Sequence, residues 1–278
     1  MPAKRYDRIV APDGTAYVLA GSGPPVVFLH GLGLDANMWA EQLEVLSARF
    51  TVVAPDLLGH GQSPAPSEGA GVRDFAAPVL ALVESLFSES VRVVGFDLGG
   101  QVAIACAASS SAPIVSLTLI STAYRRLKPQ RDIMLRRVEQ ARKHGPQANA
   151  DSAIQRWFSA EFQSKQQQWV SAVRERIASN DAAGYIIASD MYARADQETA
   201  NMLRDIHVPA LVIGGALDMG ATPAMVRGLA GAIHGAKLQI LPKQRHMPQI
   251  EAADRVNKLI SEFHGASVQA LPAETAEP

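Results

Sequence analysis

The hydrophobic positions in the first half of the chain alternate between two patterns. Short apolar runs predict strands, and three of them are continuous, as expected of parallel strands that are buried on both faces. Between the runs, apolar residues recur at the three- and four-residue spacing of helices. The predicted strands cover residues 16–20, 26–29, 51–54, 91–94 and 117–120, and the predicted helices cover 39–48, 72–87 and 101–109. This alternation predicts an α/β fold with a mostly parallel sheet and helices on both faces.

The alternation stops after the fifth predicted strand. Apolar residues such as Trp157, Phe158 and Trp169 then keep helical spacing, and no strand pattern is found. The alternation later resumes with predicted strands at 208–214 and 237–241 and predicted helices at 223–233 and 248–263. We therefore predict an all-helical segment inserted into an α/β core.

These patterns divide the chain into three parts. Residues 1–122 and 206–265 are predicted to form the core, and residues 123–205 a helical cap over the ends of the strands. Residues 266–278 are rich in Ala, Pro and Glu, a composition typical of a disordered tail.

Composition narrows the classes of function. The chain has 278 residues and is 47% hydrophobic, which is enough for a sizeable core. Its 26 basic and 27 acidic residues balance, so neither a nucleic acid nor a membrane is predicted as a partner. The beginning of the chain has no long apolar run, and Cys106 is the one cysteine. We expect a cytoplasmic protein with a small-molecule substrate; an oligomer is compatible with the sequence but not predicted by it.

One short segment carries most of the chemical information. The strand at 91–94 leads into Gly95-Phe96-Asp97-Leu98-Gly99, and a helix of small residues follows. A strand, a glycine-flanked turn and a helix are the context of a nucleophile elbow, in which the middle side chain projects into an open site. The middle residue is usually serine, but here it is Asp97.

Two further residues complete a catalytic pattern. Asp218 follows the strand near residue 214, and His246 lies in the loop between the strand at 237–241 and the last helix. The order nucleophile, acid, base, with each member after a strand, predicts a triad of Asp97, Asp218 and His246. The segment His30-Gly31-Leu32-Gly33 follows another strand. Its Leu32 N–H is expected to form an oxyanion hole with the N–H of Leu98.

From residue 16 to residue 263 the chain resembles the α/β-hydrolase family, with these motifs in the family's order. The resemblance implies an eight-stranded, mostly parallel sheet. Within the family, the cap is most similar to that of the 3-oxoadipate enol-lactone hydrolases and related esterases, through Arg156-Trp157-Phe158 and Gly184-Tyr185. Those enzymes carry serine at the elbow, whereas an aspartate there resembles the epoxide hydrolases and the haloalkane and haloacid dehalogenases.

An aspartate at the elbow favours attack on a saturated carbon. Asp97 is ionised without help and can displace an epoxide oxygen or a halide, forming an ester with the enzyme. His246, oriented by Asp218, would then activate water to hydrolyse that ester. We therefore expect hydrolysis of an epoxide or a carbon–halogen bond without a cofactor. No metal site is expected, because the remaining histidines lack ligand spacing.

Two alternatives stay open. The chain is also compatible with a carboxylic ester or enol-lactone hydrolase in which Asp97 replaces the usual serine, as an inactivating change or otherwise. It is further compatible with a catalytically silent member of the fold that binds a ligand. Attack by a carboxylate on an ester would give a mixed anhydride of higher energy, which disfavours the first alternative.

The resemblance also suggests residues of a substrate pocket. Epoxide hydrolases use cap tyrosines to protonate the opening oxygen, while a haloacid dehalogenase needs halide contacts and an arginine for the carboxylate. The pocket candidates are His30, Phe96, Tyr124, Arg125 (or its neighbour Arg126), Trp157, Tyr185 and Tyr192. Neither subfamily pattern is complete, because Gly33 stands where epoxide hydrolases have proline, and Leu32 and Leu98 stand where haloalkane dehalogenases hold the halide.

Overall fold

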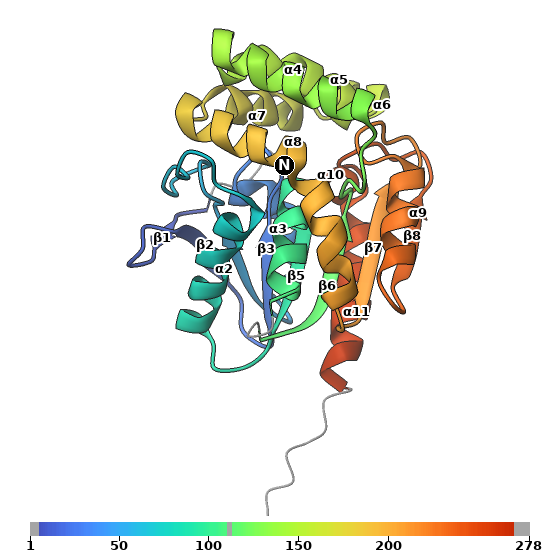
Figure 1. Ribbon diagram of the computed structural model, residues 1–278. Helices are drawn as coiled ribbons and strands as arrows, with labels where there is room; N and C mark the ends of the chain where they lie inside the picture. The colour runs from blue at the N-terminus through green and yellow to red at the C-terminus, as the bar shows by residue number, and fades with distance from the viewer. Residues whose placement is uncertain (1–5, 110–112, 270–278) are drawn as a thin grey trace, which may run out of the picture.

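The computed structural model describes residues 6–109 and 113–269 (Figure 1). Eight strands form one sheet in the order β1-β2-β4-β3-β5-β6-β7-β8. The pairs β1–β2 and β2–β4 are antiparallel, and all other neighbouring strands are parallel. The strands are β1 (Ile9–Val10), β2 (Ala16–Ala20), β3 (Pro25–Leu29), β4 (Thr51–Pro55), β5 (Val91–Phe96), β6 (Ile114–Ile120), β7 (Ala210–Gly215) and β8 (Lys237–Leu241). The predicted eight-stranded, mostly parallel sheet is confirmed.

Helices cover both faces of the sheet. Successive side chains of a strand point to opposite faces, so Val27 and Leu29 pack into one buried cluster while Val26 and Phe28 pack into the other. The first cluster lies under α2 (Val72–Leu86), α3 (Leu98–Ala107) and α9 (Pro223–Ala232), and the second under α1 (Ala40–Leu46) and α11 (Ala253–Gln269). Burial on both sides explains why the parallel strands read as continuous apolar runs.

A helical segment is inserted between β6 and β7. It comprises α4 (Lys128–His144), α5 (Ala150–Trp157), α6 (Ala160–Lys165), α7 (Gln167–Ala178) and α8 (Ala182–Met202), with 3-10 turns at Pro146–Asn149 and Leu203–Asp205. We call residues 128–205 the cap helices. Figure 1 shows α4, α5, α6 and α7 as a layer beyond one edge of the sheet. The helix α8 begins in this layer and then packs on α3, which ties the cap to the core.

The end of the chain differs from expectation. The last helix, α11, continues to Gln269, so the predicted disordered tail is wrong for residues 266–269. Residues 266–269 contain no proline or glycine that would end the helix, and they form its last turn. Residues 270–278 of that prediction lie outside the described residues.

Neither a membrane-spanning helix nor a group of metal ligands is found in the part of the chain that the structure describes. Within it, no helix is both long enough and apolar enough to cross a membrane. Over the same residues, no three His, Cys, Asp or Glu side chains are grouped as they would be around a metal ion.

Candidate active site

Asp97 lies in the sharp turn between β5 and α3. Its backbone has φ 53° and ψ −111°, a strained conformation for a residue with a side chain. The turn also needs small neighbours. A Cβ atom at Gly95 would lie 2.4 Å from the carbonyl oxygen of Gly99, and one at Gly99 would lie 2.1 Å from that of Leu29. The glycines of the sequence motif therefore allow the turn that carries Asp97 into the site.

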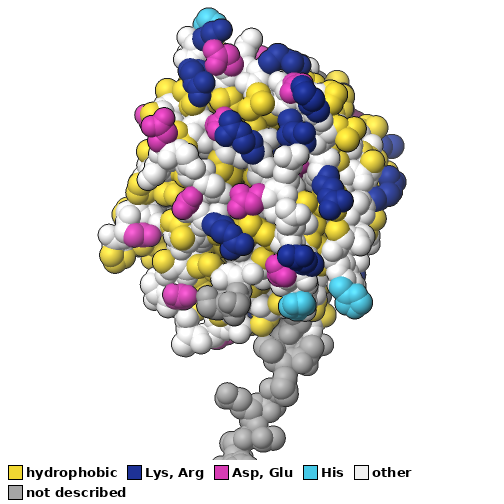
Figure 2. Space-filling view, in the orientation of Figure 1, with side chains coloured by type: hydrophobic (Ala, Val, Ile, Leu, Met, Phe, Trp, Pro, Cys, Tyr) yellow, Lys and Arg dark blue, Asp and Glu magenta, His cyan; other side chains and the backbone are white. Residues whose placement is uncertain are grey.

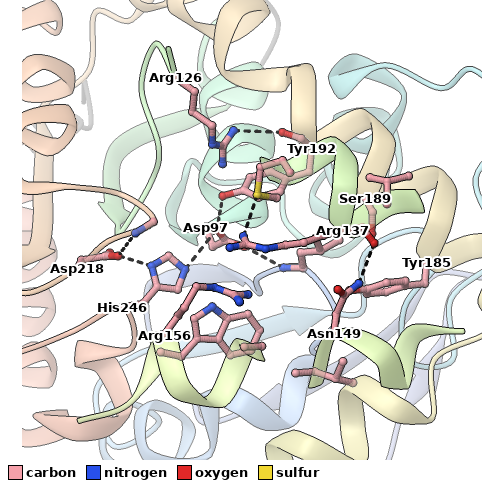
Figure 3. Close-up of a pocket in the computed structure, with 17 residues that line it drawn as sticks. Asp97, Arg126, Arg137, Asn149, Arg156, Tyr185, Ser189, Tyr192, Asp218 and His246 are labelled. Carbon is pink, nitrogen blue, oxygen red and sulfur yellow. Dashed lines mark hydrogen bonds and ion pairs between the residues drawn. The ribbon is translucent and has the colours of Figure 1, made fainter. Parts of the chain in front are cut away.

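His246 lies between two carboxylates (Figure 3). Its Nε2 atom is 3.4 Å from Oδ1 of Asp97, and its Nδ1 atom is 2.8 Å from Oδ2 of Asp218. The other oxygen of Asp218 accepts backbone N–H bonds from Gly220 at 2.7 Å and Ala221 at 3.1 Å. All three acidic and basic side chains are buried. The three residues predicted after three separate strands thus meet in the structure.

Two aromatic side chains fix the imidazole ring of His246. The ring of Phe96 lies 5.1 Å away between centroids, and that of Trp157 stacks on the imidazole at 6.0 Å. The backbone N–H of His246 donates to the carbonyl oxygen of Trp157 at 3.2 Å. The loop that carries His246 is therefore tied to the end of α5 in the cap, and its imidazole ring packs beside two aromatic rings.

The two carboxylate oxygens of Asp97 have different surroundings. Oδ2 accepts a hydrogen bond from the backbone N–H of Leu32 at 3.1 Å. Oδ1 accepts a hydrogen bond from the hydroxyl of Tyr192 on α8 and is the oxygen that faces His246. Leu98 is buried at the first position of α3, and among the described residues Leu32 gives the one backbone hydrogen bond to this carboxylate. One oxygen thus faces the backbone, and the other faces two proton-bearing side chains.

Two buried histidines hold the loop that presents Leu32. Nε2 of His60 accepts the backbone N–H of Gly33 at 2.9 Å, and Nε2 of His30 accepts that of Leu57 at 2.8 Å. Their Nδ1 atoms lie 2.9 Å and 2.8 Å from backbone carbonyl oxygens. Burial lowers the pKa of both imidazoles, that of His60 to about 3. Both rings therefore stay neutral and brace the loop through one accepting and one donating nitrogen.

Burial and charge set the protonation of the site. Burial lowers the pKa of His246, but the carboxylates of Asp218 and Asp97 outweigh it and raise that pKa to about 10. Burial raises the pKa of Asp97, but the hydrogen bond and charge of His246, with help from Tyr192 and Arg126, bring it below its usual value. Burial also raises the pKa of Tyr192 well above its ordinary value. At neutral pH the site holds an ionised Asp97, a protonated His246 and a neutral phenol.

A cavity of about 80 Å³ lies in front of Asp97, beneath the cap helices. The residues of the core that line this cavity are Leu32, Asp97, Asp218, Gly220 and His246. The lining residues from the segment between β6 and β7 are Arg126, Met134, Arg137, Val138, Asn149, Ala153, Arg156, Trp157, Ile177, Tyr185, Ser189 and Tyr192. The cavity therefore combines the predicted triad with aromatic and basic groups from the cap side.

Three of the predicted pocket residues line this cavity: Trp157, Tyr185 and Tyr192. Tyr192 contacts Asp97 directly. Tyr185 lies two turns earlier on α8, beside Ser189 and Asn149, where burial raises the pKa of its phenol. The cap tyrosine that touches the elbow is therefore Tyr192.

The pocket-facing role predicted for four other residues is wrong. Arg125 is exposed, and its guanidinium lies 5.3 Å over the ring of Tyr124. Tyr124 packs beside Gly228 on α9 instead of facing the cavity. His30 and Phe96 are fully buried behind the site, where they support the Leu32 loop and the His246 ring. Closeness to the site along the sequence does not show which way a side chain points.

The sequence pattern does not predict two arginines that the structure brings into the cavity, Arg137 on α4 and Arg156 on α5. Nothing in the pattern sets Arg137 apart, because α4 is rich in basic residues on several faces. For Arg156 a signal was present, since it directly precedes the pocket candidate Trp157. Arg126, the predicted alternative to Arg125, does line the cavity but is paired with Asp196 at 2.9 Å.

Comparisons with known proteins agree with this architecture. The family described as alpha/beta hydrolase fold matches residues 24–253. The enol-lactonase of Burkholderia xenovorans, known from its crystal structure, is 33% identical with a TM-score of 0.83, over 90% of this chain and 97% of the other. An Acinetobacter baylyi protein named (E)-2-((N-methylformamido)methylene)succinate hydrolase is 28% identical over 87% of this chain and 90% of its own length.

A third relative is similar over a shorter part. The soluble epoxide hydrolase of a Corynebacterium species is 45% identical over 87 residues, which are 31% of this chain and 30% of that protein. The whole-length likeness is therefore to an enol-lactonase and to another hydrolase, while the epoxide hydrolase likeness covers under a third of the chain.

Proposed function

This chain belongs to the α/β-hydrolase family, and on that premise we propose that it hydrolyses a small organic molecule through an ester formed on Asp97. The reaction is the opening of an epoxide or the displacement of a halide. The observation that carries this proposal is the division of the Asp97 carboxylate. Oδ2 accepts the backbone N–H of Leu32, while Oδ1 faces Tyr192 and His246.

In the first step, Oδ1 of Asp97 attacks a saturated carbon of the substrate. With an epoxide, the new bond from Oδ1 to carbon forms as the ring carbon–oxygen bond breaks, and the electron pair of that bond goes to the epoxide oxygen. As the substrate enters, the hydroxyl of Tyr192 shifts its hydrogen bond from Asp97 to the epoxide oxygen. The opening oxygen then takes the hydroxyl proton of Tyr192. The guanidinium of Arg126 lies 4.4 Å over the Tyr192 ring and stabilises the resulting phenolate.

In the second step, water attacks the carbonyl carbon of the Asp97 ester. Neutral His246 takes a proton from the water through Nε2, and the negative charge of the tetrahedral intermediate develops on Oδ2, beside the Leu32 N–H. The bond from that carbon to Oδ1 then breaks. The product leaves with Oδ1 as its new hydroxyl oxygen and takes the proton from His246. Asp97, now a carboxylic acid, returns a proton to the phenolate of Tyr192.

The charge on Asp97 controls when His246 acts. In the resting site the imidazole is protonated, because Asp218 and Asp97 raise its pKa to about 10. An ester on Asp97 carries no charge, so the raising effect of Asp97 on the pKa of His246 is lost, while the raising effect of Asp218 and the lowering effect of burial remain. The imidazole can then release its proton to solvent and serve as a base, and it takes a proton back from solvent once Asp97 is ionised again. The base is thus withheld until the covalent intermediate exists.

Tyr192 favours epoxide opening over halide displacement. A departing halide needs no proton, whereas an opening epoxide yields an alkoxide that does. The raised pKa of Tyr192 keeps the phenol protonated, and an alkoxide is basic enough to take its proton. The partial likeness to a soluble epoxide hydrolase supports the same choice.

Ester or lactone hydrolysis is the second candidate. It is favoured by the enol-lactonase that matches nearly the whole chain. Direct attack by Asp97 on an ester would form an anhydride, which is less stable than the substrate. For this reaction the position of Asp97 would suit a serine better, and an Asp97→Ser variant would gain esterase activity.

The proposal is tested by trapping the covalent enzyme. A His246→Gln variant should form the ester but not hydrolyse it, because the base is gone. The variant is incubated with a panel of epoxides, halogenated acids and aryl esters, and its intact mass is recorded. Incubation with a reactive epoxide or halide should add one substrate-derived group, mapped to the peptide that contains Asp97. The exposed His207→Gln variant is the control and should turn over without an adduct. If the panel is hydrolysed by the wild type but leaves no adduct on His246→Gln, the proposal is wrong.

A further inference from the structure

Arg137 and Arg156 face the cavity without an acidic partner. The side chain of Arg137 donates to the sulfur of Met134 at 3.2 Å, a weak acceptor. Among the described residues, Arg156 makes no side-chain hydrogen bond and no ion pair, and Arg137 makes no ion pair. Figure 3 shows both guanidinium groups in the cavity that holds Asp97 and His246. Up to five donors on Arg156 and up to four on Arg137 are thus left for a ligand that enters the cavity.

Two buried arginine side chains elsewhere in the described residues have acidic partners, whereas the buried Arg92 donates to the backbone carbonyl oxygen of His264 at 3.3 Å. Arg126 binds Asp196 at 2.9 Å, and Arg8 binds Asp56 at 2.9 Å, with both arginine side chains under 5% exposed. An unpaired charge is costly to withdraw from water, so a fold normally supplies a partner. The two cavity arginines lack the acidic partner that Arg8 and Arg126 have, and unlike Arg92 they line a cavity.

The environment of the two arginines opposes their own charge. Both are partly buried, and burial lowers the pKa of each guanidinium, that of Arg156 to about 10. The positive charge of Arg137 contributes to the lowered pKa of Arg156, so the two groups are close enough to repel each other. Both remain protonated at neutral pH. A negative group between them would remove the repulsion and restore the missing hydrogen bonds.

We propose that Arg137 and Arg156 form a carboxylate subsite, so that the molecule attacked by Asp97 is an organic acid. The inference rests on the proposed function, because it assigns the far end of the same substrate. Guanidinium groups bind carboxylates through paired, charge-assisted hydrogen bonds, which fix orientation as well as affinity. The subsite would hold the acid end while the reactive carbon lies at Oδ1 of Asp97.

The charge balance of the site agrees with one bound carboxylate. When His246 is protonated, the site carries one excess positive charge. Its carboxylates are Asp97, Asp196 and Asp218, and its cations are Arg126, Arg137, Arg156 and His246. A single substrate carboxylate neutralises this excess.

The surface of the cap near the site also carries an excess of positive charge. The helix α4, which carries Arg137, has six Lys or Arg residues and two acidic ones. Figure 2 shows basic side chains gathered over the upper part of the face, where α4 and α8 lie. Such a field raises the rate at which an anion reaches the cavity.

The subsite is tested with an unreactive acid. Binding of succinate and of uncharged succinamide is measured by calorimetry on the wild type and on Arg137→Met and Arg156→Met. Succinate should bind saturably and at least about tenfold more tightly than succinamide, and each variant should weaken succinate binding by about tenfold or more. The control is Arg136→Met, an exposed position next to Arg137, which should change binding by less than about twofold.

A second measurement uses the unaltered protein, in case a variant does not fold. Phenylglyoxal modifies accessible arginines, and peptide mapping locates the modified positions. Succinate should protect Arg137 and Arg156 and leave Arg136 unprotected. The inference is overturned if succinate and succinamide bind alike, if succinate does not bind saturably, or if succinate protects neither cavity arginine.

Failure of this inference is distinguishable from failure of the proposed function. Succinate binding requires no ester on Asp97, so it survives if the covalent mechanism is wrong. Conversely, an adduct formed on His246→Gln by an uncharged epoxide would support the mechanism even if the arginines bind no acid.

Discussion

Nε2 of His246 lies 3.4 Å from Oδ1 of Asp97, so the charge of this carboxylate contributes, with that of Asp218, to the raised pKa of His246. Two buried groups at this distance titrate as a coupled pair. In the proposed mechanism the order of chemical events follows from this coupling, because loss of the charge on Asp97 favours release of the proton of His246.

Asp97→Asn imitates the neutral ester and should lower the pKa of His246. Burial lowers this pKa, and Asp218 and Asp97 together raise it to about 10, so loss of the Asp97 charge removes a raising contribution. We expect a decrease of about 1–3 units, the size typical of one close opposite charge. NMR titration of the imidazole measures it. Asp254→Asn, at an exposed site on α11, should leave the pKa unchanged; an unchanged value in Asp97→Asn would mean that the two groups are not coupled.

Tyr192→Phe should slow the opening of epoxides much more than the displacement of halides. The hydroxyl that contacts Asp97 is the proton donor in our mechanism, and such donors contribute about 10²–10⁴-fold to rate. The measurement is the rate of ester formation in single-turnover experiments with a matched epoxide and alkyl bromide. Tyr124→Phe, outside the cavity, serves as the control. Equal slowing of both substrates would assign Tyr192 a structural role.

Arg137→Met should not destabilise the protein. Removal of an unpaired, partly buried cation is expected to change the free energy of unfolding by less than about 1 kcal/mol, or to increase it. By contrast, Arg8→Met breaks a buried ion pair with Asp56 and should cost about 3–5 kcal/mol. Chemical denaturation compares the two variants. A loss above about 2 kcal/mol in Arg137→Met would indicate that this arginine serves the fold and not a ligand.

Gly99→Ala should destabilise the elbow. Its Cβ would lie 2.1 Å from a backbone oxygen that cannot move away easily, so we expect a cost of about 1–3 kcal/mol or more. Gly231, on α9, has open space around the corresponding position. Gly231→Ala should therefore be neutral or stabilise by up to about 1 kcal/mol. Thermal or denaturant unfolding tests the pair, and equal effects would show that the elbow is not tightly packed.

The core of the fold was predictable because each of its signals is local. The strands β3, β4 and β5 are buried on both faces and therefore read as apolar runs. The positions of Asp97, Asp218 and His246 follow from strand ends, which all meet at one edge of a parallel sheet. The two-residue strand β1 was too short to give a pattern.

The cap side of the site was less predictable because it depends on how helices pack. Arg125 and Arg126 are neighbours in the chain, yet the first is exposed and the second is buried against Asp196. On α4, Arg136 is exposed, whereas its neighbour Arg137 is partly buried and lines the cavity. Which of two adjacent arginines faces the cavity is decided by the rotation of a helix or the path of a turn, and the local sequence does not specify either.

The most direct test of the mechanism follows the oxygen atoms of Asp97. A single turnover is run with enzyme in excess in water enriched with heavy oxygen, on a substrate that the wild type hydrolyses, and the Asp97 peptide is then analysed by mass spectrometry. Our account predicts that the peptide gains one heavy oxygen, while the new hydroxyl of the product comes from the enzyme and is unlabelled. Heavy oxygen in that hydroxyl, with none on Asp97, would contradict it.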